Sequence, residues 1–424
     1  MVIDVDVAVI GGGPSGAAAA IYAARAGFET ALFDAARFPR DKTCGDGLTP
    51  RAMNQLELLG VEVNPSYRNK GLKLHGFGGT VTAPWPNTYP STTGTAIARR
   101  EFDHQLFLAA EAAGATLWEE CPAGDPVVES NYLQSFRAGE HTVRARWVIV
   151  ADGVRSPFGK ALGRTWHKGE VYGIAARSYC TSPFSDEPWM HSHVELKDTD
   201  GTVQPGYGWI FPLGNGTVNL GCGALSTDAR PAKINTKKLL RHYAASQQED
   251  WQLGEPQDIA SALLPMGGAV SNVAGANWML IGDAAGCVNP LNGEGIDYGL
   301  ETAQLAVSLL PAPIGAAKQG TSAASAPDFT LLWPDVLREH YGEAFVLART
   351  AARLLTYPQF LPLVGPLGLR GPIGRVLMPA AARLMGNLVT DEDKDLIARA
   401  WRLAGKGIAG ARKDTPLWDS TLSP

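Results

Sequence analysis

Residues 4–16 read Asp-Val-Asp-Val-Ala-Val-Ile-Gly-Gly-Gly-Pro-Ser-Gly, and this stretch decides the fold. The apolar run over 4–10 predicts a buried strand that ends at a glycine-rich turn. The Ala-rich run over 17–26 has strong helix propensity, and Gly27 predicts the helix end. Residues 29–34, Glu-Thr-Ala-Leu-Phe-Asp, predict a second strand with a carboxylate at its end. The chain therefore begins with a strand–helix–strand unit.

The spacing Gly11-x-Gly13-x-x-Gly16 between strand and helix is typical of dinucleotide binding. Gly11 allows the tight turn, Gly13 lets the backbone approach a pyrophosphate, and Gly16 lets the helix pack close to the strand. Free N–H groups at the helix start can bind the phosphates, and Asp34 can accept hydrogen bonds from ribose hydroxyls. The alternative is a structural glycine turn in an unrelated α/β fold.

A second motif lies far along the chain, where the apolar run 278–282 ends at Asp283. A carboxylate at a strand end can hold a ribityl chain and a neighbouring ribose. The segment from Gly293 to Ile296 follows and opens a helix, so its amides can face a flavin ring edge, where negative charge develops on reduction. The alternative is a simple helix N-cap. A third apolar run, 147–151, ends at Asp152.

The composition excludes several classes of partner. The 424 residues suffice for two or three structural units, and the net charge of -5 argues against nucleic-acid binding. The five cysteines are far apart and lack metal-site spacing, so we expect no metal and a reduced, cytoplasmic compartment. The start of the chain lacks the pattern of a signal peptide, and no stretch is long and apolar enough to span a membrane.

These motifs resemble the flavoproteins typified by para-hydroxybenzoate hydroxylase, in which the FAD domain is discontinuous. Ala151-Asp152-Gly153-x-x-Ser156 is similar to their middle motif. The chain departs from the aromatic hydroxylases at Gly159, where those enzymes carry an Arg. This departure argues against NADPH-linked hydroxylation.

Within that superfamily the closer resemblance is to the geranylgeranyl reductases. Three segments carry it: Lys42-Thr43-Cys44-Gly45-Asp46-Gly47, Ala98-Arg99-Arg100-Glu101-Phe102-Asp103 and Tyr207-x-Trp209-x-Phe211-Pro212. The stretches 206–219, 264–270 and 289–302 look especially like the actinobacterial menaquinone reductases, which saturate one isoprene unit of the menaquinone side chain.

The resemblance implies an α/β fold with a discontinuous Rossmann-like FAD-binding domain, an inserted antiparallel-sheet substrate domain and a C-terminal helical region. We place FAD-binding segments at 1–75, 98–165 and 273–312, substrate segments at 76–97 and 166–272, and the helical region at 328–424. Residues 311–327, rich in Ala, Gly, Ser and Pro, predict a loop or insertion.

The cofactor implied is FAD, and the resemblance assigns contacts to it. They are Gly11, Gly13, Pro14, Ser15, Gly16, Asp34, Cys44, Gly45, Asp46, Gly47, Arg99, Ala123, Asp152, Asp283, Gly293, Gly295 and Ile296. The implied activity is FAD-dependent reduction of an isoprene double bond in a polyprenyl chain, with menaquinone as the expected substrate. Hydride would come from N5 of the reduced flavin, and the electron donor would be NADPH or a reduced carrier protein.

Tyr207, Trp209 and Phe211 alternate along a predicted strand and therefore share one face. From the residues alone, ordinary sheet core is the favoured interpretation. The resemblance implies instead that the three rings contact the substrate. It also places Cys44 beside the flavin, which suggests the hypothesis that Cys44, or an ordered water, supplies the proton to the second alkene carbon.

Other functions remain open at this point. One is reduction of geranylgeranyl diphosphate or a geranylgeranyl lipid, another is flavin-dependent oxygenation or halogenation, and a third is prenyl binding without catalysis, as in escort proteins. The apolar stretch 354–389, with scattered arginines, predicts either peripheral docking on the inner face of the cell membrane or a helical layer over the substrate domain. Glu294 either lines the flavin edge or caps a helix. His191 and His193 can share a strand face, but we expect surface histidines rather than metal ligands.

Overall fold

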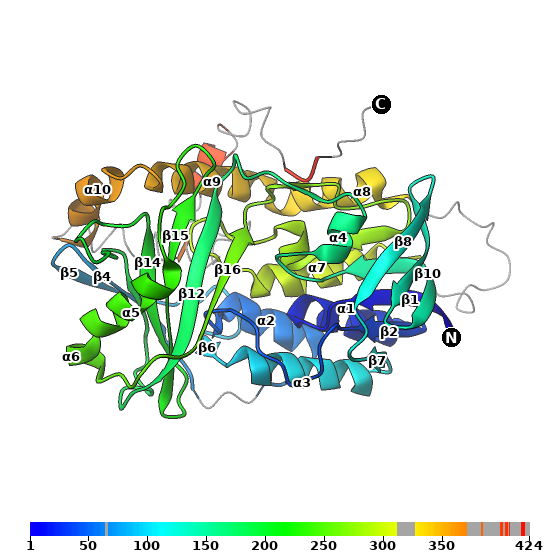
Figure 1. Ribbon diagram of the computed structural model, residues 1–424, viewed down its shortest axis with the longest axis horizontal. Coiled ribbons are helices and arrows are strands. Elements are labelled where there is room, and N and C mark those ends of the chain that lie inside the picture. Colours follow the sequence, from blue (N-terminus) through cyan, green and yellow to red (C-terminus); the bar gives the residue numbers. More distant parts are fainter. Residues whose placement is uncertain are drawn as a thin grey trace.

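The computed structural model describes residues 1–63, 67–311 and 327–370, together with 383–384, 399–401, 403–405, 407 and 417–419. The described residues form two large sheets that lie side by side, each with helices packed against it (Figure 1).

The first sheet is assembled from distant parts of the chain. In spatial order its strands are β7 (Thr116–Trp118), β2 (Thr30–Phe33), β1 (Val2–Ile10), β10 (His141–Val150), β9 (Tyr132–Ala138) and β8 (Ala123–Glu129), with β18 (Trp278–Leu280) also paired to β10. Strands β7, β2, β1, β10 and β18 pair in parallel, whereas β10, β9 and β8 are antiparallel. The predicted strand–helix–strand unit and the discontinuous α/β fold are confirmed.

Helix α1 (Pro14–Arg25) packs on β1, β2 and β10 and lies between two further helices, α3 (Arg99–Ala112) and α7 (Ile296–Ser308). The alanines of α1 at positions 17–20 are fully buried, and their small side chains let the helix approach the sheet closely. Helix α2 (Pro50–Leu59) packs on α7, and α4 (Pro157–Ala161) packs on β8. The short 3-10 helix η1 (Gly282–Ala285) follows β18. These elements set the strand ends and helix starts where the FAD motifs lie.

The second sheet carries the aromatic strand. In spatial order it contains β16 (Gln257–Pro265), β12 (Tyr172–Thr181), β15 (Thr217–Ser226), β14 (Gly206–Pro212), β13 (Met190–His193), β4 (Gly71–Gly76) and β5 (Gly79–Pro84). Neighbouring strands are antiparallel except β13 and β4, which pair in parallel, so the predicted antiparallel sheet contains one parallel pair. Strand β4 begins at Gly71, within the segment 1–75 that we placed in the FAD-binding domain.

Helix α5 (Thr236–Ser246) covers one face of the second sheet, where Leu239 and Tyr243 pack against Ile210 and Cys222. The remaining helices are α6 (Gln248–Trp251), α8 (Phe329–Leu337), the π-helix η2 (Arg338–Gly342), α9 (Glu343–Leu355) and α10 (Phe360–Leu369). Helix α10 packs on β4 and β5. The stretch 328–370 is therefore largely helical, as predicted, whereas residues 312–326 and most of 371–424 lie outside the described residues.

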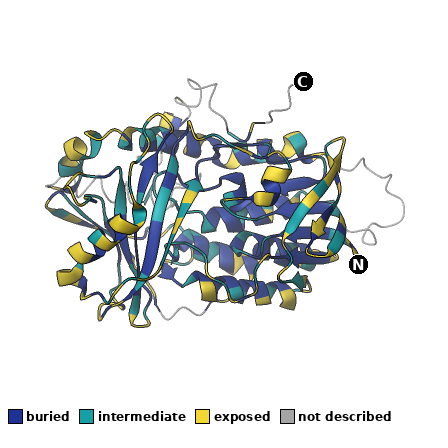
Figure 2. Ribbon diagram, in the orientation of Figure 1, coloured by how far each residue is buried: buried dark blue, intermediate teal, exposed yellow. Residues whose placement is uncertain are grey.

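Two short ribbons link these parts: β3 (Gly47–Leu48) pairs with β6 (Thr95–Ala96), and β11 (Thr165–Trp166) pairs with β17 (Val270–Ser271). Buried residues concentrate in both sheets and in the helix faces against them (Figure 2). Within the part of the chain that the structure describes, no helix is long and apolar enough to cross a membrane.

Candidate FAD and substrate site

The turn between β1 and α1 brings the motif glycines against the ends of neighbouring strands. Gly11 has a φ of 98°, and a Cβ there would lie 2.4 Å from the Ala151 carbonyl oxygen. A Cβ on Gly16 would lie 1.8 Å from the Gly11 carbonyl oxygen. A Cβ on Gly13 would come no closer than 3.7 Å to its neighbours, so there is space beside the start of α1. The turn thus leaves room for a phosphate at a helix N-terminus.

Asp34 follows β2 and is held firmly beside this turn. Its Oδ2 accepts a hydrogen bond of 2.7 Å from the Gly12 N–H and one of 3.3 Å from the Arg40 guanidinium. Its Oδ1 accepts a hydrogen bond of 2.9 Å from the Ala36 N–H. The residue is only 7% exposed. The carboxylate therefore has a fixed position at the strand end, where the sequence analysis expects a ribose.

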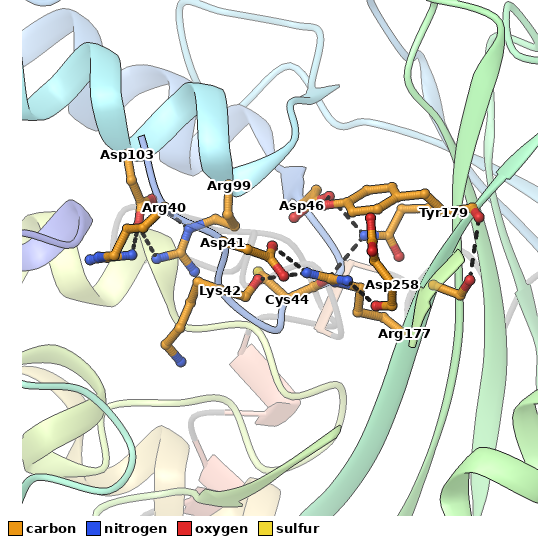
Figure 3. Close-up of polar contacts among 12 residues, drawn as sticks. Arg40, Asp41, Lys42, Cys44, Asp46, Arg99, Asp103, Arg177, Tyr179 and Asp258 are labelled. Carbon is orange, nitrogen blue, oxygen red and sulfur yellow. Dashed lines mark hydrogen bonds and ion pairs between the residues drawn. The ribbon is translucent and has the colours of Figure 1, made fainter. Parts of the chain in front are cut away.

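Two arginines beside the turn share one buried carboxylate. Arg99, at the start of α3, donates to both oxygens of Asp103 at 2.6 and 2.9 Å, and Arg40 donates to Asp103 at 2.9 Å (Figure 3). Asp103 is fully buried, and this pairing keeps the Arg99 pKa above its usual range although burial alone would lower it. Asp103 thus orients two cations toward the space at Gly13. Neither Arg40 nor Asp103 was assigned a role from the sequence.

Cys44 lies in the loop that precedes β3, and its carbonyl accepts a hydrogen bond of 2.9 Å from the Asn219 side chain. Burial raises the pKa of the Cys44 thiol, although Arg99 nearby opposes this, so the thiol is protonated at neutral pH. Burial also lowers the pKa of Lys42 in the same loop. The thiol is therefore a group that can hold a proton, not a reactive thiolate.

Asp152, after β10, is engaged within its own loop. Its Oδ1 accepts a 2.5 Å hydrogen bond from the Ser156 hydroxyl, and its Oδ2 accepts one of 2.8 Å from the Phe158 N–H. A Cβ on Gly159 would lie 2.2 Å from the Ser156 hydroxyl oxygen, so the loop as it stands has no room for the hydroxylase Arg. The cation near Asp152 comes instead from Arg164, and burial lowers the pKa of Arg164 to about 10. The sequence analysis missed Arg164.

The second motif meets the first through Asp283 in η1. A Cβ on Gly295 would lie 3.0 Å from the Asp283 Oδ1, so the loop before α7 folds tightly against this carboxylate. The Gly293 N–H donates to the Asn289 carbonyl at 2.9 Å, and the Glu294 N–H donates to the Asn292 side chain at 2.9 Å. Those two amides therefore stabilise the loop itself. The N–H groups at the start of α7 are the ones that can donate hydrogen bonds to a bound cofactor.

Glu294 lines the cavity beside this loop. Burial, together with the neighbouring Asp297, raises the Glu294 pKa well above its usual range. This favours the interpretation that Glu294 lines the flavin edge over that of a charged helix cap.

The three rings of β14 form a continuous wall. Centroids are 5.8 Å apart for Tyr207 and Trp209, and 6.3 Å apart for Trp209 and Phe211. The Tyr207 hydroxyl donates to the Asn292 carbonyl at 2.6 Å, and the Trp209 indole N–H donates to the Asn219 side chain at 2.9 Å. The polar atoms are thus satisfied at the edges, and the rings offer an apolar surface. Their predicted common face is confirmed.

All these elements line one cavity of about 700 Å³ between the two sheets. Of the residues proposed from the sequence, Gly16 alone is absent from its lining, because it packs inside the turn. The proposed lining residues are Gly11, Gly13, Pro14, Ser15, Asp34, Cys44, Gly45, Asp46, Gly47, Arg99, Ala123, Asp152, Tyr207, Trp209, Phe211, Asp283, Gly293, Gly295 and Ile296. Leu361, Val364 and Leu369 of α10 also reach the cavity, although none was predicted as a site residue. The packing of α10 on β4 and β5 fits the predicted alternative of a helical layer over the substrate domain.

The expectation of surface histidines on β13 is wrong for His191, which is 8% exposed. The parallel partner β4 places His75 beside both histidines: His75 Nε2 lies 2.9 Å from His191 Nδ1, and its ring stacks on His193. Burial lowers the pKa of His191 and of His193 to about 3, so both rings are neutral. Among the described residues, no His, Cys, Asp or Glu group is arranged to hold a metal ion.

Comparison with known proteins places this site in a family. A family model described as an FAD binding domain matches residues 4–324. The menaquinone reductase of Mycobacterium tuberculosis is 49% identical over 410 residues, which is 95% of each chain. The menaquinone reductase of Mycolicibacterium smegmatis is 50% identical over 418 residues, which is 96% of this chain and 97% of that protein.

Among solved structures, a geranylgeranyl bacteriochlorophyll reductase-like protein from Thermoplasma acidophilum matches with a TM-score of 0.73. It is 19% identical, and the match covers 95% of this chain and 100% of that one, so it shows the same fold. The chain is thus an FAD-dependent oxidoreductase. It belongs to the family that contains the two menaquinone reductases.

Proposed function

We propose that this oxidoreductase reduces one isoprene double bond in the side chain of menaquinone. The observation that carries the proposal is the single cavity in which the aromatic wall of β14 faces the FAD-contact loops. Two relatives that match nearly the whole chain bear the name menaquinone reductase, which supports this substrate over other polyprenyl compounds.

The cavity lining suits a polyprenyl chain. The apolar part of the lining crosses the second sheet from Leu264 on β16 to Leu72 on β4, and Trp209 lies on β14, a strand between these two. A polyprenyl chain offers methyl groups and isolated double bonds and almost no hydrogen-bonding atoms. Such a chain gains most of its binding energy from burial against apolar side chains, which is what this surface provides.

The residues present fit FAD. The start of α1 and the guanidinium groups of Arg40 and Arg99 supply donors for a pyrophosphate, and Asp34 and Asp283 stand at strand ends where ribose and ribityl hydroxyls can be bound. When bound and reduced, the cofactor supplies the hydride, after it has taken electrons from NADPH or a reduced carrier protein. The protein must then exclude water, hold the alkene against the cofactor and provide a proton.

Cys44 is proposed to act on the substrate side of the cofactor, because its protonated thiol lies in the cavity lining. Replacement of Cys44 by alanine should slow alkene reduction and leave FAD bound, as judged by the flavin absorption spectrum. Unchanged turnover in this variant would contradict a role for the thiol in the reaction.

The function is tested anaerobically. The flavin is photoreduced, menaquinone or geranylgeranyl diphosphate is added, flavin reoxidation is followed, and the product is analysed by mass spectrometry. We expect a gain of two hydrogens in menaquinone. The same gain in geranylgeranyl diphosphate alone would assign the other prenyl substrate. In a parallel reaction with oxygen, hydroxylation of the product would assign a monooxygenase.

We also propose that the enzyme docks on the inner face of the cell membrane through α10. Leu361 and Leu369 of this helix line the cavity, whereas Leu363 and Leu367 are 70% and 64% exposed. One helix thus joins the cavity to an apolar patch that can enter the lipid surface where a menaquinone tail resides. Of the stretch 354–389 singled out in the sequence, residues 371–382 and 385–389 lie outside the described residues.

The docking proposal is tested with the double variant Leu363→Ser, Leu367→Ser in a liposome sedimentation assay. Binding should fall while FAD content stays the same, because the changed side chains point away from the protein. Leu58→Ser is the matched control, since Leu58 is 58% exposed on α2. Equal sedimentation of all three proteins would contradict docking through α10.

A further inference from the structure

Asp46 is an acid buried in the wall of the cavity. It lies in the loop between Cys44 and β3, it is 1% exposed, and it lines the cavity together with Cys44 and Trp209. Its φ is 63°, in the left-handed region, and its carbonyl accepts a hydrogen bond of 3.1 Å from the Ile97 N–H. The loop therefore holds this carboxyl group in one place.

The two oxygens of this carboxyl group differ. Oδ2 accepts hydrogen bonds from the Tyr179 hydroxyl at 2.7 Å and from the Asn219 amide at 2.8 Å. Oδ1 is buried and has no hydrogen-bond partner among the described residues. Both donors thus hold one oxygen, and the other is left to carry a proton.

The groups around Asp46 set the balance between its neutral and ionised forms. Burial raises its pKa to about 6, against the hydrogen bonds from Tyr179 and the positive charges of Arg99 and Arg177. Cys44 also faces it, as a neutral thiol. An acid of this strength can be protonated near neutral pH, and its anion is stabilised in place after the proton has left.

We propose that Asp46 is the acid that protonates the alkene, an assignment that rests on the proposed function. The π bond of the isoprene unit breaks; one carbon takes the hydride that the reduced cofactor supplies, and the other takes the proton from Oδ1 of Asp46. Two C–H bonds form, the alkene gains two electrons and two hydrogens in total, and Asp46 is left as a carboxylate that still accepts hydrogen bonds from Tyr179 and Asn219.

A chain of polar contacts leads from this carboxylate toward solvent. The Arg177 guanidinium lies over the Tyr179 ring, 4.6 Å from its centroid, and donates a hydrogen bond to Asp41 (Figure 3). The side chain of Asp41 is 48% exposed, whereas that of Arg177 is fully buried. The positive charge of Arg177 on this side stabilises the Asp46 anion, and Asp46 takes up a proton from water that enters the cavity after the product has left. Cys44 is also close to donors, the Asp46 N–H and the Arg99 guanidinium, but burial still raises its pKa above that of a free thiol. Asp46 is the stronger acid, so we assign the proton to Asp46 and contact with the alkene to Cys44.

The variant Asp46→Asn separates this role from a structural one. An amide oxygen can accept the bonds from Tyr179 and Asn219, and the amide nitrogen can take the place of Oδ1, so the loop is conserved. With the variant saturated with FAD, we expect photoreduction to proceed as in the wild type and flavin reoxidation by menaquinone to be slower by about 100-fold or more. Asp335→Asn, at an α8 carboxylate whose side chain is 69% exposed, is the control and should react like the wild type.

A second measurement does not depend on turnover. The carboxylic-acid C=O band of the oxidised wild-type protein should lose intensity with a midpoint near the Asp46 pKa. That change should be missing in Asp46→Asn and present in Asp335→Asn. Wild-type reoxidation should fall about tenfold per pH unit above this midpoint, and Tyr179→Phe should move the midpoint upward, because it removes a hydrogen bond to the anion.

The proposal is overturned if FAD-saturated Asp46→Asn reoxidises at the wild-type rate, or if Cys44→Ala alone abolishes the pH dependence. Failure of the proposed function looks different. In that case the wild type and Asp46→Asn would both add no hydrogen to menaquinone, while the infrared titration of Asp46 would remain.

Discussion

Replacement of Gly16 by alanine tests how closely α1 must approach the turn. The added Cβ would lie 1.8 Å from the Gly11 carbonyl oxygen and 3.0 Å from its carbon, and no side-chain rotation can relieve contact with backbone atoms. Overpacking of this kind costs about 1–3 kcal/mol, and alanine within a helix recovers about 1 kcal/mol relative to glycine. Because this overlap is deep, we expect a net loss of about 2 kcal/mol in the free energy of unfolding of the FAD-free protein.

Gly13→Ala is the matched comparison. Gly13 has φ -72° and ψ -176°, which alanine adopts without strain, and its Cβ would have no neighbour nearer than 3.7 Å. The FAD-free variant should keep its stability within about 1 kcal/mol. Its methyl group would nevertheless occupy the approach to the pyrophosphate, so FAD affinity should fall by about tenfold or more, which corresponds to about 1.4 kcal/mol.

The assay for both variants is urea denaturation of FAD-free protein, followed by tryptophan fluorescence, together with FAD titration. Gly16→Ala should lower both stability and FAD affinity, whereas Gly13→Ala should lower affinity alone. A Gly16→Ala protein as stable as the wild type, or a Gly13→Ala protein destabilised to the same extent, would refute the assignment of packing to Gly16 and cofactor approach to Gly13.

Two stability measurements test the buried polar network. The pKa of Asp46 is about 6 in the folded protein and about 4 in an unfolded chain, so the folded state binds more protons between these values. The free energy of unfolding should therefore fall by about 2 kcal/mol as pH rises from about 4 to about 6, a loss that Asp46→Asn should lack in urea titrations at both pH values. Trp209→Phe removes the hydrogen-bond donor to Oδ1 of the fully buried Asn219, and should lower the free energy of unfolding by about 1–3 kcal/mol in the same urea titrations. Tyr207→Phe removes the donor to the carbonyl of Asn292, which is less buried, so the loss of stability should be smaller.

The local patterns of the chain were enough to predict a large part of this molecule. The strand, turn and helix around Gly11 and Gly16 could be predicted because their signals lie within a few residues of one another: an apolar run, a glycine spacing and an Ala-rich segment. The common face of Tyr207 and Phe211 followed from the two-residue period of a strand. The family resemblance then predicted which distant segments meet, and all of the proposed contacts except Gly16 line one cavity.

Only the tertiary structure decided the contacts between residues that share no local sequence pattern. Arg164 is placed near Asp152 in the folded loop, although the expected position for an arginine was 159. His75 meets His191 because β4 pairs in parallel with β13, a register that no periodicity in either strand encodes.

In the site too, some features could be predicted from local sequence and others depend on the tertiary structure. The family resemblance predicts Asp46 as a cofactor contact, but its burial and its hydrogen bonds to Tyr179 and Asn219 depend on how the loop packs against the second sheet. The sequence by itself determined the FAD-binding elements and the aromatic strand, because short-range periodicity and glycine geometry specify them. The tertiary structure alone decided that Asp46 is buried with its Oδ1 outside any hydrogen bond in the described part of the chain, because burial and hydrogen-bond partners come from segments that are far apart in the sequence.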